Sequence, residues 1–137
     1  METLNIYTDG GAKGNPGPAA IGIVFKNEKG EIIWQKNQSI GQATNNQAEY
    51  EAILYALKHA NRYHPKKIRV FSDSELVVKQ LQGKYKIKEP DIQKLFLRAW
   101  NKKLDFQDIE FHLIPREQNQ EADRLVKSIL NQKSLDI

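Results

Sequence analysis

The sequence of 137 residues predicts an α/β fold in which about four helices flank a five-stranded mixed sheet, as a single domain over residues 1–137. Three observations predict this fold. Apolar residues alternate through the first forty positions as in strands, helical periodicity marks four later stretches, and two short apolar runs separate some of these stretches. Two domains are not expected, because a chain this short could not give each of them a good core.

The first three predicted strands lie at residues 4–8, 20–25 and 31–40. The first meets Asp9-Gly10-Gly11, the second follows a Pro-Gly-Pro turn, and the turn at residues 27–30 precedes the third. Because only short turns separate these strands, we expect an antiparallel meander.

The rest of the chain alternates helices with strands. Thr44 and Gln47 have the spacing of a capping box, Gly83 is a helix stop signal, Pro90 fits a first helical position, and Asn119 can cap the last helix. These signals place helices at about residues 45–60, 74–81, 90–104 and 120–130, strands at 67–71 and 109–114, and a frayed tail at 131–137. Each of these two strands follows a helix, so each can lie parallel to the sheet through a right-handed crossover.

Composition narrows the class of protein. Hydrophobic residues make up 39% and charged residues 28%, as in globular proteins, and the absence of cysteine excludes disulfides, zinc–thiolate sites and thiol nucleophiles. No apolar run approaches the ~20 residues of a membrane span, and the N-terminus lacks a signal pattern. We therefore expect a cytoplasmic protein without membrane contact, and a monomer, since nothing indicates a protein partner. The net charge of +4 indicates little by itself. It becomes informative only if the carboxylates cluster in one place, because the remaining surface would then be more basic than the total suggests.

Four acidic residues stand where a cluster is expected. Asp9 and Asp73 directly follow the first and fourth strands, so parallel pairing would bring both to the same sheet edge. Glu49 shares a helix face with Ile53 and Leu57, and Asp123 lies beside the apolar stripe of the last helix. Such carboxylates repel one another and resist burial unless a cation joins them. Oxygen ligands favour Mg²⁺ or Mn²⁺, and two such ions about 3.5–4 Å apart can hydrolyse a phosphodiester.

Each acid also has a structural interpretation. Asp9-Gly10 could form a turn, residues 72–75 offer helix caps around Asp73, and Asp123 near a helix start favours the helix dipole. These interpretations explain the acids separately but not their expected convergence. The glycine-rich stretch at residues 9–18 lacks the Gly-Lys-Ser/Thr ending of a phosphate loop and precedes a strand, which argues against nucleotide binding.

Four motifs, in order, resemble those of type 1 ribonuclease H, and the match covers about residues 4–130. They are Tyr7-Thr8-Asp9-Gly10-Gly11 with Gly14-Asn15-Pro16-Gly17-Pro18, Thr44-Asn45-Asn46-Gln47-Ala48-Glu49, Ser72-Asp73-Ser74, and Asn119-Gln120-Glu121-Ala122-Asp123. The resemblance implies a ribonuclease H-like fold with strand order 3-2-1-4-5. It also implies endonucleolytic hydrolysis of the RNA strand of RNA–DNA hybrids by a two-metal-ion mechanism, leaving 5′-phosphate and 3′-hydroxyl ends. Asp9, Glu49, Asp73 and Asp123 would then be the catalytic ligands of two Mg²⁺ or Mn²⁺ ions.

The resemblance also suggests substrate-binding residues. Positions that in similar enzymes contact the RNA strand and its 2′-hydroxyls are Gly10, Gly11, Asn15, Asn46 and Gln47. Thr44 is a candidate for a DNA phosphate contact, with helix capping as an equal alternative. Asn15 could instead be a turn former, and Asn46 a helix cap.

Two features depart from the family pattern. Many relatives have a histidine in the loop before the last helix, whereas here the loop is Pro115-Arg116-Glu117-Gln118. Arg116 could take over part of the catalytic role of that histidine by contacting a phosphate. Alternatively, Arg116 is an ordinary loop arginine. The connection at residues 82–90 is too short for the basic insertion of many relatives, so the chain would be a short form. Its Lys84, Lys86 and Lys88 could hold a DNA backbone or be solvated.

These departures keep two other functions open. The first is a module on the same fold that binds hybrids without cutting them, although such a module would not need four clustered acids. The second is a phosphotransferase in which Asp9 is the nucleophile.

Overall fold

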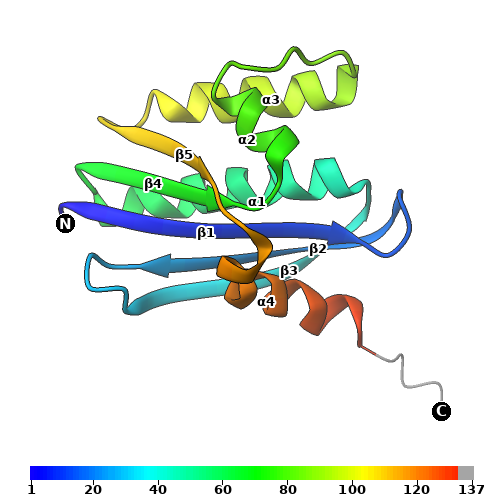
Figure 1. Cartoon of the computed structure of the whole chain (residues 1–137), viewed down its shortest axis with the longest axis horizontal. Helices are drawn as coiled ribbons and strands as arrows, with labels where there is room; N and C mark the ends of the chain where they lie inside the picture. The colour runs from blue at the N-terminus through cyan, green and yellow to red at the C-terminus, as the bar shows by residue number, and fades with distance from the viewer. Residues whose placement is uncertain (133–137) are drawn as a thin grey trace.

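Five strands form one mixed sheet in the computed structural model, which describes residues 1–132 (Figure 1). The strands are β1 (Thr3–Ala12), β2 (Gly17–Lys26), β3 (Ile32–Ala43), β4 (Lys67–Ser72) and β5 (Ile109–Leu113). Their order is β3-β2-β1-β4-β5; β2 is antiparallel to both β1 and β3, whereas β4 is parallel to β1 and β5 to β4. The predicted fold class, meander and strand order are confirmed. The predicted frayed tail lies, from residue 133 on, outside the described residues.

Helices cover both faces of the sheet. They are α1 (Asn45–Ala60), α2 (Glu75–Leu81), α3 (Pro90–Lys103) and α4 (Gln120–Leu130), with short 3-10 turns η1 (Asn61–Tyr63) and η2 (Arg116–Gln118). Figure 1 shows α4 in front of the sheet and α1 behind it, with α2 and α3 above α1. Of the helices within residues 1–132, none has the length and apolarity to cross a membrane.

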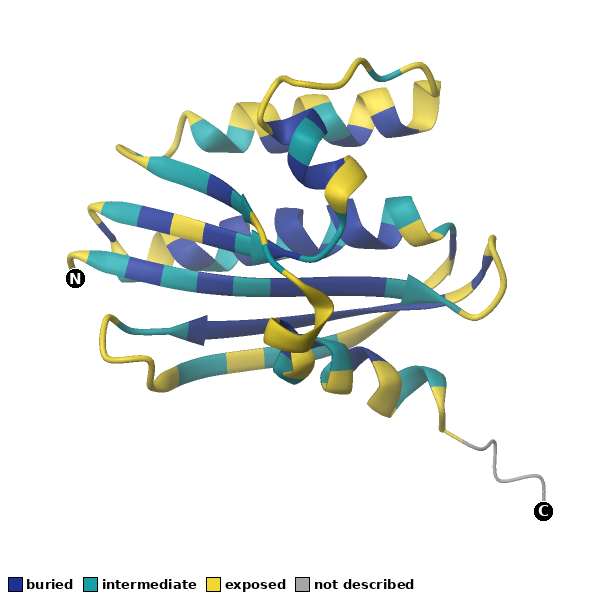
Figure 2. Ribbon diagram, in the orientation of Figure 1, coloured by how far each residue is buried: buried dark blue, intermediate teal, exposed yellow. Residues whose placement is uncertain are grey.

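The core lies between α1 and the sheet, where the ribbon of Figure 2 is mostly dark blue. Alternate residues of β1, namely Leu4, Ile6 and Thr8, are fully buried, as the period-two pattern of a strand requires. Opposite them α1 buries Ile53 and Leu57. A Leu-to-Ala change in such a position costs about 2–5 kcal/mol, so this contact is a major source of the sheet's stability.

β1 is longer than predicted. The sequence indicated a strand ending at Thr8, but β1 continues because it stays paired with β2 as far as Ala12 opposite Ala19. Asp9 is therefore inside a strand, and the interpretation of Asp9-Gly10 as a turn is wrong. The pairing of β1 with β4 ends earlier, at Tyr7 opposite Phe71. Beyond that point no strand within residues 1–132 pairs with the β4 side of β1.

The helix starts are partly as predicted. Thr44 caps α1 in a full capping box with Gln47: the Thr44 hydroxyl accepts from the Gln47 N–H at 3.2 Å, and the Gln47 side chain accepts from the Thr44 N–H at 2.8 Å. Ser74 caps α2. Asn119 occupies the cap position of α4, but its side chain makes no capping hydrogen bond, so the prediction of a cap there is wrong for the side chain.

Two glycines let helices touch strands directly. A Cβ at Gly10 would lie 2.3 Å from the carbonyl carbon of Ala48 in α1, and a Cβ at Gly22 would lie 2.4 Å from the carbonyl oxygen of Ala122 in α4. Only a residue without a side chain permits such contact. The N-terminal parts of α1 and α4, which carry Glu49 and Asp123, are thus held against opposite faces of the sheet.

Candidate active site

Three carboxylates meet beside β1 where β4 has ended. Asp9, Glu49 and Asp73 each offer an oxygen, and these oxygens lie within 4.8 Å of one another. Asp9 comes from β1, Glu49 from the fifth position of α1, and Asp73 from the residue after β4. We call these residues the three-acid cluster. Because the pairing of β1 with β4 ends at Tyr7, Asp9 lies beyond the paired part of β1, and side chains from different layers of the fold approach one another there.

Asp123 lines the same cleft from α4. The cleft has a volume of about 560 Å³ and is lined by the three-acid cluster together with Gly10, Gly11, Asn46, Arg116, Asp123 and Lys127, among others. Asp123 is close enough to Asp9 for its charge to act on that carboxyl group. Its own oxygen is held by the ammonium of Lys127 at 2.9 Å, so its immediate partner is a cation of the chain.

Burial makes the three-acid cluster hard to ionise. Burial raises the pKa of Asp9 to about 7, with added repulsion from Asp73 and Asp123 and an opposing hydrogen bond with Glu49. The pKa of Glu49 is also well above its ordinary value, first because of burial and then because of Asp9. The Gly10 N–H and the Ser72 hydroxyl, the latter at 3.5 Å, donate to Glu49 and offset only part of this cost. A cation bound among these oxygens would remove the penalty.

The pKa of Asp73 is subject to opposing effects. Burial raises its pKa, while a hydrogen bond from Asn119 and the charge of Arg116 lower it. The amide of Asn119 also donates to the Thr8 carbonyl at 2.9 Å, and Asn119 is buried. Asn119 therefore connects β1, the end of β4 and the start of α4. The sequence indicated only a cap there; its position in the fourth motif was the sole signal of a further role.

The glycine-rich loop after β1 is tied to α1 by a residue that the sequence reasoning missed. The side chain of Asn45 accepts from the Ala12 N–H at 2.9 Å, while the Asn45 N–H donates to the Asn15 side chain, also at 2.9 Å. Asn15 thus has a structural role in addition to the predicted substrate contact. The adjacent asparagines at 45 and 46 were the available signal, but nothing local distinguishes which one faces the loop.

The other predicted substrate-binding residues occupy different environments. Gly10, Gly11 and Asn46 line the acidic cleft. Thr44 and Gln47 are engaged with each other in the capping box, so the capping role of Thr44 is observed and its DNA-phosphate contact stays a prediction. Gln47 also lines a separate cavity beside β3 and α3. Asn46 is not the cap of α1, because Thr44 holds that position.

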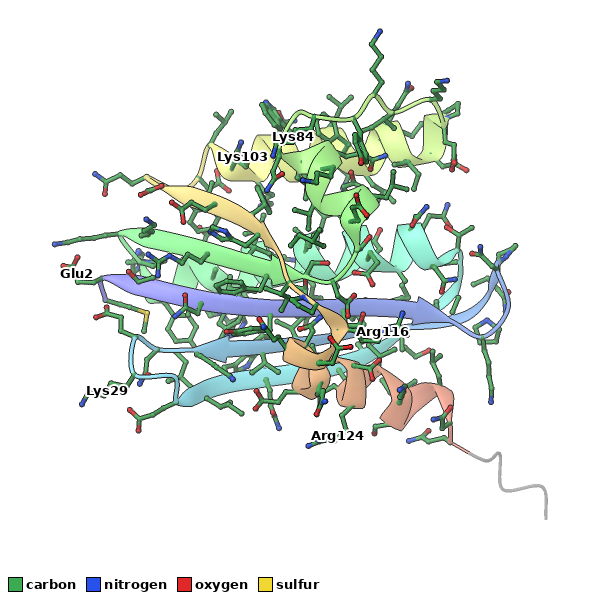
Figure 3. All side chains as sticks on the ribbon, in the orientation of Figure 1. Glu2, Lys29, Lys84, Lys103, Arg116 and Arg124 are labelled. Atoms are coloured by element: carbon green, nitrogen blue, oxygen red, sulfur yellow. The ribbon has the colours of Figure 1, made fainter. Side chains whose placement is uncertain are left out.

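The departures from the family pattern also have defined positions. Arg116 is exposed, lines the acidic cleft and lies in front of the sheet, on the segment between β5 and α4 (Figure 3). His112 is engaged elsewhere, 2.9 Å from Glu110 and stacked on Phe71. On the short connection, Lys86 and Lys88 line a smaller cavity of about 190 Å³ together with Asn46, so this basic segment adjoins the cleft.

The strand order and the carboxylates that meet beside β1, Asp9 inside that strand and Asp73 directly after β4, define a ribonuclease H-like protein. Residues 7–129 match the family model described as Reverse transcriptase-like. The chain belongs to this family, and its relatives include ribonucleases H.

Two relatives show how far the similarity extends. Ribonuclease HI of Halobacterium salinarum is 39% identical over 128 residues, which are 93% of this chain and 64% of that protein. The bifunctional protein Rv2228c of Mycobacterium tuberculosis is 38% identical over 127 residues, or 92% of this chain but 35% of that protein. The chain thus spans about a third of the mycobacterial protein and just under two thirds of the archaeal one.

Solved structures agree closely with the fold. The crystal structure of RNase H1 from H. salinarum superposes with a TM-score of 0.91 at 39% identity, covering 94% of this chain and 98% of that one. A structure of LC11-RNase H1 in complex with RNA/DNA hybrid gives a TM-score of 0.87 at 44% identity, covering 91% of this chain and 94% of that one.

Proposed function

We propose that this protein is an endonuclease that hydrolyses the RNA strand of RNA–DNA hybrids by a two-metal-ion mechanism, leaving 5′-phosphate and 3′-hydroxyl ends. The observation that carries the proposal is the convergence of Asp9, Glu49 and Asp73 in a cleft, with Asp123 beside Asp9. Burying a group of like charges destabilises the folded protein, and bound divalent cations would offset that cost while serving hydrolysis.

The donors fit Mg²⁺ or Mn²⁺. In the part of the chain that the structure describes, the clustered donors are carboxylate oxygens alone, which is the set that these hard cations prefer. The three-acid cluster would hold one ion, and Asp123 together with Asp9 would hold the second. Bound there, the ions would supply activation of the attacking water and neutralisation of the charge on the leaving oxygen.

The chain's own residues would bind and orient the hybrid. Arg116 at the cleft can donate two hydrogen bonds to one phosphate. Gly10, Gly11 and Asn46 line the cleft and Asn15 lies on the adjoining loop, where backbone and amide groups can contact 2′-hydroxyls, the groups that distinguish RNA from DNA. Gln47 would extend this contact and Thr44 would meet a DNA phosphate. Lys86 and Lys88 are placed to attract the backbone.

Substrate choice rests on similarity as well as on chemistry. LC11-RNase H1, at 44% identity over 91% of this chain, has been solved with an RNA/DNA hybrid. We extend that substrate to this protein because the cleft offers both a place for divalent cations and amides suited to the 2′-hydroxyl.

The proposal is tested with matched RNA–DNA, RNA–RNA and DNA–DNA duplexes, each in Mg²⁺ and in Mn²⁺. We expect cleavage of the hybrid, in its RNA strand, with 3′-hydroxyl products. Asp9→Asn should keep the fold and abolish cleavage. Asp105→Asn, the same chemical change at an exposed site paired with Lys102, should leave cleavage intact.

Other outcomes distinguish the alternatives. Binding of the hybrid without cleavage in either metal would identify a non-cutting hybrid-binding module. Phosphoryl label trapped on Asp9 would identify a phosphotransferase. Robust turnover by Asp9→Asn would disprove the metal-binding role of the cluster.

A single domain, a monomer and a cytoplasmic location also remain predictions. Sedimentation velocity would test whether the protein is a monomer.

A further inference from the structure

The four acids at the cleft differ in their immediate partners. Within residues 1–132, the members of the three-acid cluster form no ion pair with a lysine or arginine. Asp123 does: its Oδ2 lies 2.9 Å from Nζ of Lys127, one helical turn further along α4. The ammonium group of Lys127 is thus paired with the Asp123 carboxylate, which would complete the second metal site.

The position of Lys127 makes this pair more than a surface contact. Lys127 lines the same cleft as the three-acid cluster and Asp123, so its ammonium is close to where the second cation would lie. An ammonium is a compact point charge on a flexible stem and can leave without a change in the backbone. Lys127 is 64% exposed, and an ion pair so accessible to water is weak enough to be displaced by a divalent ion.

We propose that Lys127 is a resident counter-ion of Asp123 that competes with the second metal ion. This inference rests on the function proposed above. The first ion binds tightly because, within residues 1–132, no lysine or arginine is ion-paired with the three-acid cluster and Arg116 only acts on Asp73 through its charge. The second must displace Lys127 from Asp123 and tolerate its positive charge nearby, so it binds more weakly. Lys127 is thus a positioning residue that separates the two affinities and fixes the order of loading.

The test measures Mn²⁺ binding to the intact protein in the absence of substrate. Electron paramagnetic resonance reports the concentration of free Mn²⁺, and calorimetry gives the affinities of the sites. Wild-type protein should show a tight and a weak site. Lys127→Met keeps most of the length of the side chain and its helix propensity while removing the charge. It should strengthen the weak site roughly 3- to 10-fold and leave the tight site unchanged. Lys127→Arg, which keeps the charge, should stay close to wild type.

Arg124→Met is the matched control. Arg124 is an exposed residue of the same helix, it is not among the residues of the cleft, and Figure 3 shows it on the other side of α4 from Arg116. Its replacement lowers the net charge of the chain by the same amount. A shift confined to Lys127→Met supports the inference. An equal shift in both variants, or an unchanged weak site in Lys127→Met, overturns it.

Activity gives a second readout and separates this inference from the proposed function. In Lys127→Met, half-maximal cleavage of the hybrid should need correspondingly less Mn²⁺, whereas Arg124→Met should match wild type. If Asp9→Asn still cleaves the hybrid, the proposed function fails and the inference falls with it. If Asp9→Asn is inactive but Lys127→Met binds and uses Mn²⁺ as wild type does, only the competition by Lys127 is disproved.

Discussion

The ionisation of Asp9 links solution pH to folding. Its pKa is raised to about 7, so its contribution to stability is fully present below the unfolded value of 3.8 and is lost as pH rises through 7. Metal-free protein should therefore be less stable at pH 8 than at pH 5 on account of this residue. Asp9→Asn lacks the ionisable group and should escape the loss.

The measurement is denaturant unfolding in a chelator. We expect the stability of Asp9→Asn relative to wild type to rise by about 3 kcal/mol from pH 5 to pH 8. Glu110, whose pKa is lowered to about 2 by His112 and Lys67, titrates below this window and is present in both proteins. Parallel pH curves for the two proteins would mean that Asp9 is not buried as the structure has it.

Asn119 provides a second prediction for a single side chain. Asn119→Ala removes the donor to the buried Thr8 carbonyl and the hydrogen bond to Asp73. An unsatisfied buried polar group costs about 1–3 kcal/mol, so the free energy of unfolding should fall by that amount. Gln118→Ala, an exposed neighbour in η2, is the control and should change stability by less than about 0.5 kcal/mol. Equal effects of the two substitutions would contradict the role of Asn119.

Among the elements, the contact of α1 with β1 has the strictest steric requirement. Gly10→Ala would place a methyl group 2.3 Å from the Ala48 backbone, and the helix would have to move. We expect a loss of roughly 3 kcal/mol in the free energy of unfolding, measured by denaturant titration. At Gly11 the added Cβ meets the side chains of Val126 and Leu130 at ordinary distances of 3.5 and 3.7 Å, so Gly11→Ala should cost much less. The prediction fails if both variants are equally stable.

Local signals in the sequence located most elements correctly. The Thr44–Gln47 capping box, the stop at Gly83 and Pro90 at the start of α3 depend on neighbours within a few residues, so they are visible in the sequence. The same holds for Glu49, whose place on the apolar face of α1 follows from helical spacing. The structure adds that the resulting burial raises its pKa.

Features that depend on distant partners could not be predicted. β1 extends to Ala12 because β2 pairs with it there, and no local property of Asp9-Gly10-Gly11 reveals this. The partner of the Asn119 amide, the Thr8 carbonyl, is 111 positions away in the sequence. Likewise the Lys127 partner of Asp123 has the spacing of an ordinary helix pair, and only the shared cleft gives it significance.

For the molecule as a whole, metal binding and folding should be coupled. Cations that bind the native cleft but not the unfolded chain stabilise by RT ln(1 + [L]/Kd), or about 2.7 kcal/mol at a hundredfold excess over Kd. The thermal midpoint should therefore rise in millimolar Mg²⁺ or Mn²⁺, and more at pH 8 than at pH 5, because the carboxyl groups must ionise to bind. Asp9→Asn is the control and should respond little. An unchanged midpoint of the wild type in both metals would argue against a metal site.

The early end of β4 has a consequence for biosynthesis. It leaves a notch in which groups from β1, α1 and the end of β4 gather, and α4 closes the arrangement through Asn119 and Asp123. A nascent chain in which α4 is still inside the ribosome lacks the hydrogen bond from Asn119 to the Thr8 carbonyl and also lacks the Asp123 carboxylate. The proposed hydrolysis of hybrids, which rests on all four carboxylates, would therefore begin only after α4 has emerged and docked.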